Sequence, residues 1–187
     1  MPTPERTTTE AVIAAGRAIV EEGGLAALTM QAVAARVGVR APSLYKRVRD
    51  RDELVRRIAE ATADELGARL RSAAERAGED PREALVGLAH ELRAFARERP
   101  HTYQLIFGPL PSAARPEPDV LASAAAPVLE VTRRLAGDED ALEAARTVTA
   151  WANGFLLMEV AQAFRLGGDL DAAYAWGIKR LADAIAR

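Results

Sequence analysis

The sequence predicts an all-α protein of about nine helices, on three observations. The 187-residue chain is rich in alanine, the residue with the highest helix propensity. β-Branched and aromatic residues, which favour strands, form few clusters. Apolar residues instead recur every three or four positions between helix caps and glycine stops. With 49% apolar and 28% charged residues, the chain can bury a core of ordinary size.

The first two helices are marked by their caps. A capping box of Thr7 and Glu10 predicts the start of the first helix, and Gly23–Gly24 predicts its end. Thr29 is the expected N-cap of the second helix, and Gly38 is its expected stop. The apolar residues between them lie at i, i+3, i+4 and i+7 on one helical face: Met30, Val33, Ala34 and Val37.

A tight turn leads to a short third helix, in whose first turn Pro42 fits well. Leu44 and Val48 lie four residues apart and are expected on its buried face, so its polar and basic side chains point outward. Asp50 and Glu53 form a second capping box, which predicts the start of a long fourth helix.

The middle of the chain carries the strongest helix start. Residues 80–83, Asp-Pro-Arg-Glu, combine an N-cap, a proline in the first turn and a capping box. A short helical segment is expected over 101–107, followed by a proline-rich loop over 108–118. The next helix should run to about Leu135, with Pro127 kinking or breaking it.

Two long helices are expected to end the chain. Asp138 is the predicted cap of a helix over 139–166, which Gly167–Gly168 would stop. Asp169 is the predicted cap of a last helix over 170–185.

Composition excludes several classes of function. Cysteine is absent and there are two histidines, so disulfides, thiol catalysis and a metal or cofactor site are not expected. No serine lies in a Gly-x-Ser-x-Gly elbow, and His90-Glu91 is followed by Ala94 where a metalloprotease has histidine, so we expect no enzyme. Without a signal-like N-terminus or an apolar run of ~18 residues, the chain is predicted to be cytoplasmic and free of membrane contact.

The net charge of −2 conceals an uneven distribution. Up to Arg57 there are ten basic and seven acidic residues, whereas the remainder has 15 basic and 20 acidic ones. Arg36–Arg51 alone holds six bases and one acid. Tyr45, the one aromatic residue in the first half of the chain, lies in this basic stretch beside Lys46 and Arg47. A tyrosine among cations suits contact with a nucleic-acid backbone, although it could also brace the third helix against the first.

The second helix, the glycine-containing turn and the short basic third helix together form a helix-turn-helix. The N-terminus of the second helix could direct free N–H groups at a phosphate, and Thr29 could act there as a simple cap, a phosphate ligand or both. The stretch Leu28–Leu54, LTMQAVAARVGVRAPSLYKRVRDRDEL, resembles the DNA-binding signature of TetR-family transcriptional regulators. The resemblance lies in the Gly38-Val39 turn, in Ser43-Leu44-Tyr45 and in the acidic start of the fourth helix.

The resemblance implies a set of DNA contacts. They are Thr29, Arg40, Ala41, Ser43, Tyr45, Lys46 and Arg47. Thr29, Tyr45, Lys46 and Arg47 would mostly hold phosphates, and the other three are placed to touch base edges. This chain departs from the family in having Val48 where phenylalanine is usual and Arg47 where an aromatic residue or histidine is usual.

The resemblance also implies two domains. Residues 1–52 would bind DNA, a helix from about residue 52 would connect, and residues 53–187 would bind an effector and dimerise. Arg99–Phe107 and Trp151–Phe155 resemble markers of a regulatory subgroup, which commonly has histidine where this chain has Asn153. The candidate pocket residues are Leu92, Phe95, Tyr103, Phe107, Trp151, Asn153 and Phe155.

Dimerisation is expected through the last two long helices. The candidate interface residues are Met158, Gln162, Trp176 and Leu181. One face of the expected long helix carries a stripe at i, i+4, i+7 and i+11, which is more often core or dimer seam than pocket: Trp151, Phe155, Met158 and Gln162. Dimerisation has separate support, because one helix-turn-helix makes few base contacts whereas two related by a dyad read a palindrome.

These observations predict a DNA-binding transcriptional regulator, a repressor that a small-molecule effector releases from a palindromic, double-stranded operator. The alternative is a helical scaffold or interaction protein that keeps the family's shape without binding DNA. Salt-dependent affinity for DNA discriminates between the two.

Overall fold

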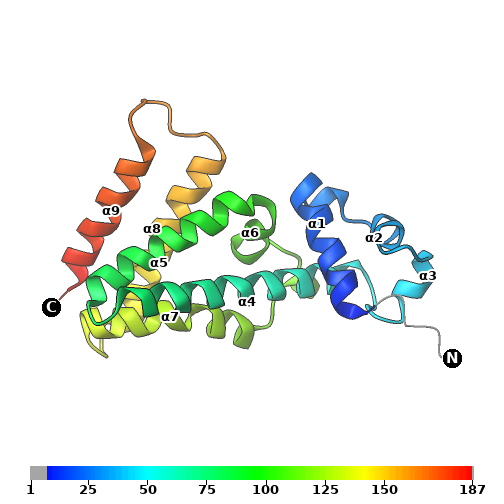
Figure 1. Ribbon diagram of the computed structural model, residues 1–187, viewed down its shortest axis with the longest axis horizontal. Helices are drawn as coiled ribbons and strands as arrows, with labels where there is room; N and C mark the ends of the chain where they lie inside the picture. Colours follow the sequence, from blue (N-terminus) through cyan, green and yellow to red (C-terminus); the bar gives the residue numbers. More distant parts are fainter. Residues whose placement is uncertain (1–7, 187) are drawn as a thin grey trace. The chain divides into compact units, whose positions relative to one another are not determined.

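The computed structural model describes residues 8–186, in which every regular element is helical and no strand occurs (Figure 1). The α-helices of this stretch are α1 (Thr9–Ala27), α2 (Met30–Val37), α3 (Ala41–Leu44), α4 (Arg51–Ala77), α5 (Pro81–Glu98), α6 (Pro100–Phe107), α7 (Pro118–Ala136), α8 (Ala141–Val160) and α9 (Leu170–Ile185). A 3-10 turn, η1 (Ser112–Ala114), lies between α6 and α7. The all-α prediction is confirmed. None of these helices combines the length and apolar character that a membrane span requires.

The described chain forms two compact units. The N-terminal unit holds the residues up to Ala63 together with Arg99–Leu121, and the C-terminal unit holds Asp64–Glu98 together with the residues from Ala122 on. The predicted boundary at residue 52 divides the chain by function and does not refer to these structural units, so it stays a prediction.

The start of α1 differs by one residue from the prediction. Thr8 is the N-cap, and its hydroxyl accepts a hydrogen bond from the Ala11 amide at 3.1 Å, while the predicted cap Thr7 lies outside the described residues. The predicted stop is where the helical backbone breaks: Gly24 has φ 70° and ψ 177°, and one further turn follows. Left-handed φ values of this kind favour glycine.

The core of the N-terminal unit combines two distant parts of the chain. Apolar residues of α1, α2, α3 and the start of α4 are buried together, among them Val12, Leu28 and Leu44. Leu105 of α6 and Ala114 of η1 complete the same core, although they lie some way along the chain from it. The proline-rich loop is therefore partly built into this unit.

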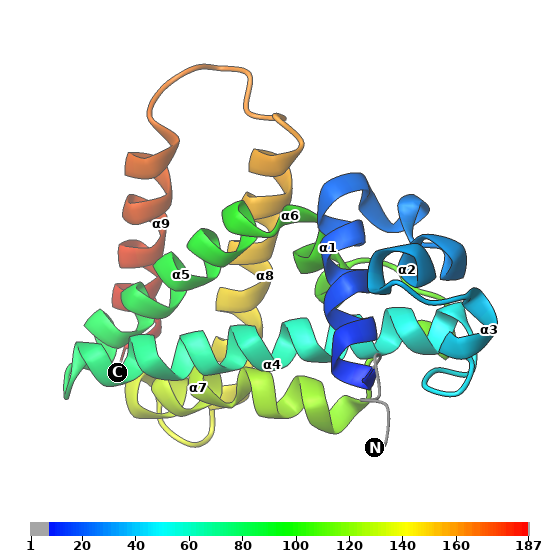
Figure 2. The ribbon, with the colours of Figure 1, turned by 45° about the vertical axis from the view of Figure 1, so that its right-hand side comes forward.

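In the C-terminal unit, α8 and α9 run side by side and are joined by the loop over 161–169 (Figures 1 and 2). The helix predicted over 139–166 is shorter than expected, because α8 ends at Val160. Gln162 adopts the left-handed region with φ 51°, and the Ala163 amide donates to the Met158 carbonyl at 2.8 Å. The chain turns back here, and Phe164 packs against Phe155 with ring centroids 4.8 Å apart.

Other predicted boundaries in the C-terminal unit hold with small changes. Asp140, rather than Asp138, is the N-cap of α8, without a side-chain hydrogen bond. Asp169 caps α9 as predicted, and its carboxylate accepts from the Asp171 and Ala172 amides at 2.8 and 3.1 Å. Pro127 is buried inside α7, which continues through it.

Candidate nucleic-acid interface

The helix-turn-helix of the sequence prediction is formed by α2, the turn over 38–40 and α3 (Figure 2). Thr29 is the N-cap of α2, and its hydroxyl accepts from the Ala32 amide at 3.0 Å. Gly38 ends α2 with φ 73°, a conformation that favours glycine, and the Val39 amide then donates to the Ala34 carbonyl at 3.0 Å. These bonds set a tight turn into the next helix.

α3 is a short helix fixed by two buried side chains. It covers Ala41–Leu44 and continues as a turn, in which the Val48 amide donates to the Leu44 carbonyl at 3.0 Å. Leu44 and Val48 are both buried, as their four-residue spacing predicted. The residues between them are consequently turned away from the core.

The predicted DNA contacts lie on the surface of the N-terminal unit. Thr29 is at the start of α2, and the others lie in one stretch over 40–47. The side chains of Thr29, Arg40, Ser43, Tyr45 and Lys46 are exposed, and Ala41 and Arg47 are partly exposed. Tyr45 is 54% exposed. The structure thus presents all seven side chains to solvent, and their contact with DNA stays a prediction.

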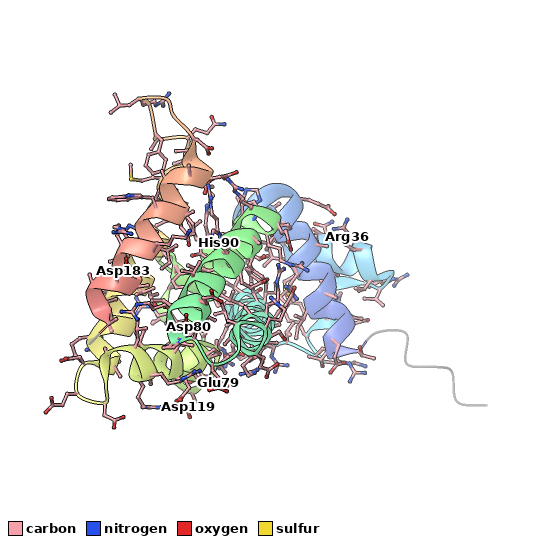
Figure 3. The ribbon with its side chains drawn as sticks, turned by 60° about the vertical axis from the view of Figure 1, so that its left-hand side comes forward. Arg36, Glu79, Asp80, His90, Asp119 and Asp183 are labelled. Atoms are coloured by element: carbon pink, nitrogen blue, oxygen red, sulfur yellow. The ribbon has the colours of Figure 1, made fainter. Side chains whose placement is uncertain are left out.

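At least half of the bases in the stretch Arg36–Arg51 are engaged within the protein. Arg36, which projects from α2 (labelled in Figure 3), donates to both carboxylate oxygens of Glu22 at 2.7 and 2.9 Å. This pairing lowers the pKa of the Glu22 carboxyl, chiefly through the hydrogen bond from Arg36. Arg49 donates to Asp50 at 2.8 Å.

Arg51 turns inward and donates to the carbonyls of Leu28 and Leu25 at 2.7 and 2.8 Å. Among the described residues, the side chains of Arg40 and Lys46 have no hydrogen-bond or ion-pair partner. They flank Tyr45, so the positive charge that is available to a ligand is concentrated around this side chain. The charge count of the sequence could not separate these two residues from the engaged arginines.

The start of α4 locks the end of the helix-turn-helix in place. The Glu53 amide donates to Asp50 at 2.8 Å, and the Glu53 carboxylate accepts from the Arg49 amide at 2.6 Å, so the predicted capping box forms. Arg57 donates two further hydrogen bonds to the Glu53 carboxylate, at 2.9 and 2.5 Å. The Arg49 amide is the main cause that lowers the pKa of the Glu53 carboxyl, against the opposing effect of its burial.

The predicted pocket residues are divided between the two units. Leu92 and Phe95 are buried in α5, and Trp151, Asn153 and Phe155 lie on α8, all in the C-terminal unit. Tyr103 and Phe107 belong to α6 in the N-terminal unit, where their rings pack 4.9 Å apart. Trp151 and Phe155 contact Tyr174 of α9, with ring centroids 5.1 and 5.0 Å away.

The C-terminal unit also has an open groove of about 520 Å³ between α4 and α7. Its lining includes Arg71, Glu75, Pro127, Val131 and Arg134, and none of the predicted pocket residues. This groove therefore does not test the predicted pocket, which stays a prediction.

The predicted interface residues lie on or beside the α8–α9 pair. Met158 and Trp176 are exposed apolar side chains, with Trp176 exposed to 69%. Gln162 is exposed in the loop that follows α8, and Leu181 is partly exposed on α9. Leu157 and Val160 add further exposed apolar surface at the end of α8. The sequence pattern did not single out these two residues.

Two family models match the chain. Residues 85–181 match the family described as "Tetracyclin repressor-like, C-terminal domain", and residues 12–58 match "Bacterial regulatory proteins, tetR family". The first match covers just over half of the chain, and the second covers the helix-turn-helix.

Individual proteins give a consistent picture. The uncharacterized HTH-type transcriptional regulator Rv0681 of Mycobacterium tuberculosis is 29% identical over 189 residues, which span 98% of this chain and 84% of that protein. A protein of unknown function from Rhodococcus sp. RHA1 has a TM-score of 0.85 at 21% identity, with 100% of both chains covered. A variant of TetR from Acinetobacter baumannii AYE, in complex with minocycline, has a TM-score of 0.65 at 23% identity, covering 92% of this chain and 93% of that one. The two structural matches establish a shared fold.

Proposed function

This chain belongs to the TetR family of bacterial transcriptional regulators, and on that premise we propose that it is a dimeric repressor released from a palindromic operator by a small-molecule effector. The observation that carries the proposal is the exposed Tyr45, set between the unpartnered cations Arg40 and Lys46 on and beside α3. Exposed cations and a phenol suit phosphate contact, while the small side chains of Ala41 and Ser43 allow α3 to approach base edges.

Operator recognition by a dimer is supported by the apolar surface of the α8–α9 pair. Four large apolar side chains are exposed on this helix pair: Leu157, Met158 and Val160 at the end of α8, and Trp176 on α9. Exposed apolar side chains at one helix pair favour a protein partner, and a second copy of the chain is the proposed occupant. Changing Trp176 to Asp should give a folded monomer in light scattering, whereas a dimer that persists would contradict this assignment.

Release by an effector is supported by the family and by its minocycline-bound member in Acinetobacter baumannii. For this chain we propose an apolar effector site in the C-terminal unit that uses the predicted residues Leu92, Phe95, Trp151 and Phe155. The two copies of α3 in the dimer must have the spacing that fits the operator. An effector that binds more tightly to a dimer with a different spacing would shift the population to that form and release the operator.

The DNA contacts are tested with a duplex selected from a random pool by the wild-type protein. Tyr45→Ala and Lys46→Ala should weaken binding to this duplex in gel shifts at fixed salt, with fold and dimer unchanged. Because Lys46 is assigned to a phosphate, its loss should also reduce the slope of log K against log salt by about 0.9 for each contact removed.

Arg71→Ala is the matched control, because it removes one cation from α4 in the C-terminal unit and should leave the affinity unchanged. Unaltered binding by both Tyr45→Ala and Lys46→Ala would refute the interface. A wild-type dimer with no salt-dependent affinity for any DNA would favour a helical scaffold instead.

A further inference from the structure

The N-terminus of α6 is capped by a carboxylate from α1, although 80 residues separate them in the chain. Glu21 accepts hydrogen bonds from the His101 amide at 3.2 Å and from the Thr102 amide at 3.1 Å. The Thr102 hydroxyl donates to the same carboxylate at 2.9 Å. The imidazole Nδ1 of His101 lies 2.9 Å from the backbone carbonyl of Glu21.

α6 needs this acceptor because it has no local cap. Its N-cap residue, Arg99, makes no side-chain capping bond, and Pro100 begins the helix. The first amides of a helix lack intrahelical partners, and a carboxylate near them is favourable for the helix dipole as well. Thr102 is almost fully buried and the Glu21 side chain is 26% exposed, so the contact is partly shielded from water. The Glu21 carboxylate supplies both a hydrogen-bond acceptor for these amides and a negative charge at the α6 N-terminus.

Glu21 stands in a place that its own helix does not favour. It lies near the C-terminal end of the regular part of α1, just before the break at Gly24, where an acid opposes the helix dipole. The residue therefore contributes through its contact with α6 and costs α1 some of its intrinsic stability.

The end of α1 is in turn tied to the helix-turn-helix. Glu22, the next residue, pairs with Arg36 of α2 at 2.7 Å. The connector between α1 and α2 is held through the carbonyls of Leu25 and Leu28, which accept from Arg51. Thr29 follows directly and begins α2. The end of α1 is thus hydrogen-bonded to α6 through Glu21 and to the last turn of α2 through Glu22, and the connector that leads into Thr29 is held by Arg51 of α4.

We propose that Glu21 is a positioning residue for DNA binding, which makes the placement of α2 and Thr29 depend on the placement of α6. The inference rests on the proposed function for its effect on DNA. Its structural content, that α6 and α2 are energetically coupled through Glu21, can be measured without DNA. Glu21 itself makes no contact with DNA in this scheme.

The coupling is measured by amide hydrogen exchange on Glu21→Gln and Thr102→Val. Thr102→Val changes no charge and removes one donor to Glu21, whereas Glu21→Gln places an amide NH₂ against the donors of α6. Both variants should speed exchange at the start of α6 and also at Ala32 and Val33 in the first turn of α2. The double variant should resemble Glu21→Gln alone, because both changes break the same contact.

Operator affinity gives the second readout. Because a loosened α2 is less well organised for binding, Glu21→Gln should bind the selected duplex roughly five- to tenfold more weakly, within the usual range of coupling between sites. Thr102→Val should show a smaller loss in the same direction. Leu85→Val, in the core of the C-terminal unit, is the control for a general loss of stability and should leave α2 exchange and DNA affinity unchanged.

The outcomes separate this inference from the proposed function. Faster exchange in α6 with unchanged exchange in α2 would overturn the coupling. Unchanged affinity in Glu21→Gln, with wild-type protein that binds the duplex, would overturn its role in DNA binding. Coupled exchange in a protein whose wild type selects no duplex would support the coupling and refute the proposed function alone.

Discussion

Tyr45 and Tyr174 show how differently one residue type is used in the two units. Tyr45 in the N-terminal unit is 54% exposed and lies among cations. Tyr174 in the C-terminal unit is fully buried, and its hydroxyl donates to the Ala89 carbonyl at 2.8 Å. Burial raises the pKa of the Tyr174 phenol. Tyr45, which has no aromatic neighbour in the sequence, lies open to solvent, whereas Tyr174 packs in a core against Trp151 and Phe155.

The cations follow the same contrast. Arg93 is almost fully buried, and its guanidinium lies 4.7 Å from the centre of the Tyr174 ring. It donates to both oxygens of Glu159 at 2.9 and 2.8 Å, so that α5 is joined to the end of α8. Lys46 beside Tyr45 has no such partner among the described residues. Arg93 therefore serves internal cohesion in the C-terminal unit, whereas the Lys46 side chain in the N-terminal unit remains available to a partner.

The largest expected effect comes from removing the buried cation. Arg93→Ala leaves Glu159 without its main partner, and breaking a buried pair in this way costs about 3–5 kcal/mol of the free energy of unfolding. Arg97→Ala removes a half-exposed partner of the same glutamate and should cost at most about 1 kcal/mol. Denaturant unfolding of both variants measures the difference, and equal losses would show that burial does not distinguish the two arginines.

The next largest effect on stability is expected from changing the two tyrosines to phenylalanine. Tyr174→Phe removes the buried hydrogen bond from the hydroxyl to the Ala89 carbonyl, so the free energy of unfolding should fall by about 1 kcal/mol. Tyr45→Phe touches no internal contact and should change it by less than about 0.5 kcal/mol. Thermal unfolding and a gel shift on the same samples test the contrast. The contrast between the two tyrosines is refuted if Tyr45→Phe is the more destabilising change.

The smallest expected effect is on the pH dependence of stability. Hydrogen bonds from Arg93, and then from Arg97, lower the pKa of the Glu159 carboxyl below its ordinary value. A lowered native pKa adds stability that is complete above the unfolded value of about 4.3 and is lost as the pH falls through the native one. The melting temperature should therefore drop on acidification below about pH 4.5, and Glu159→Gln should flatten this drop. An unchanged acid slope in Glu159→Gln would contradict the assignment.

Much of the fold and the outline of the interface could be predicted because local signals specify them. Thr29, Gly38 and the Leu44–Val48 spacing act within a few residues of themselves, and each is found as predicted. The start of α1 was less certain, since Thr7, Thr8 and Thr9 are adjacent and any of them can cap a helix.

Features that depend on distant partners could not be predicted. The pairing of Arg36 with Glu22 and the inward turn of Arg51 need the folded arrangement of α1, α2 and α4. The end of α8 is set by Phe164 returning to Phe155, whereas the sequence pointed to the glycines further on. Glu21 carried no signal of its own, because a single acid on a helix is usually only solvated surface.

The N-terminal unit is built from two separate stretches of the chain, and this affects both its folding during synthesis and its use in protein engineering. Leu105, Leu110 and Ala114 leave the ribosome well after α1, α2 and α3, yet they complete the same core. The nascent unit must therefore wait, with apolar surface uncovered, until the segment after α5 has been made. A fragment cut at Ala63 carries the predicted DNA-contact residues without the segment that completes their core, so it is a poor module to transplant into a fusion protein.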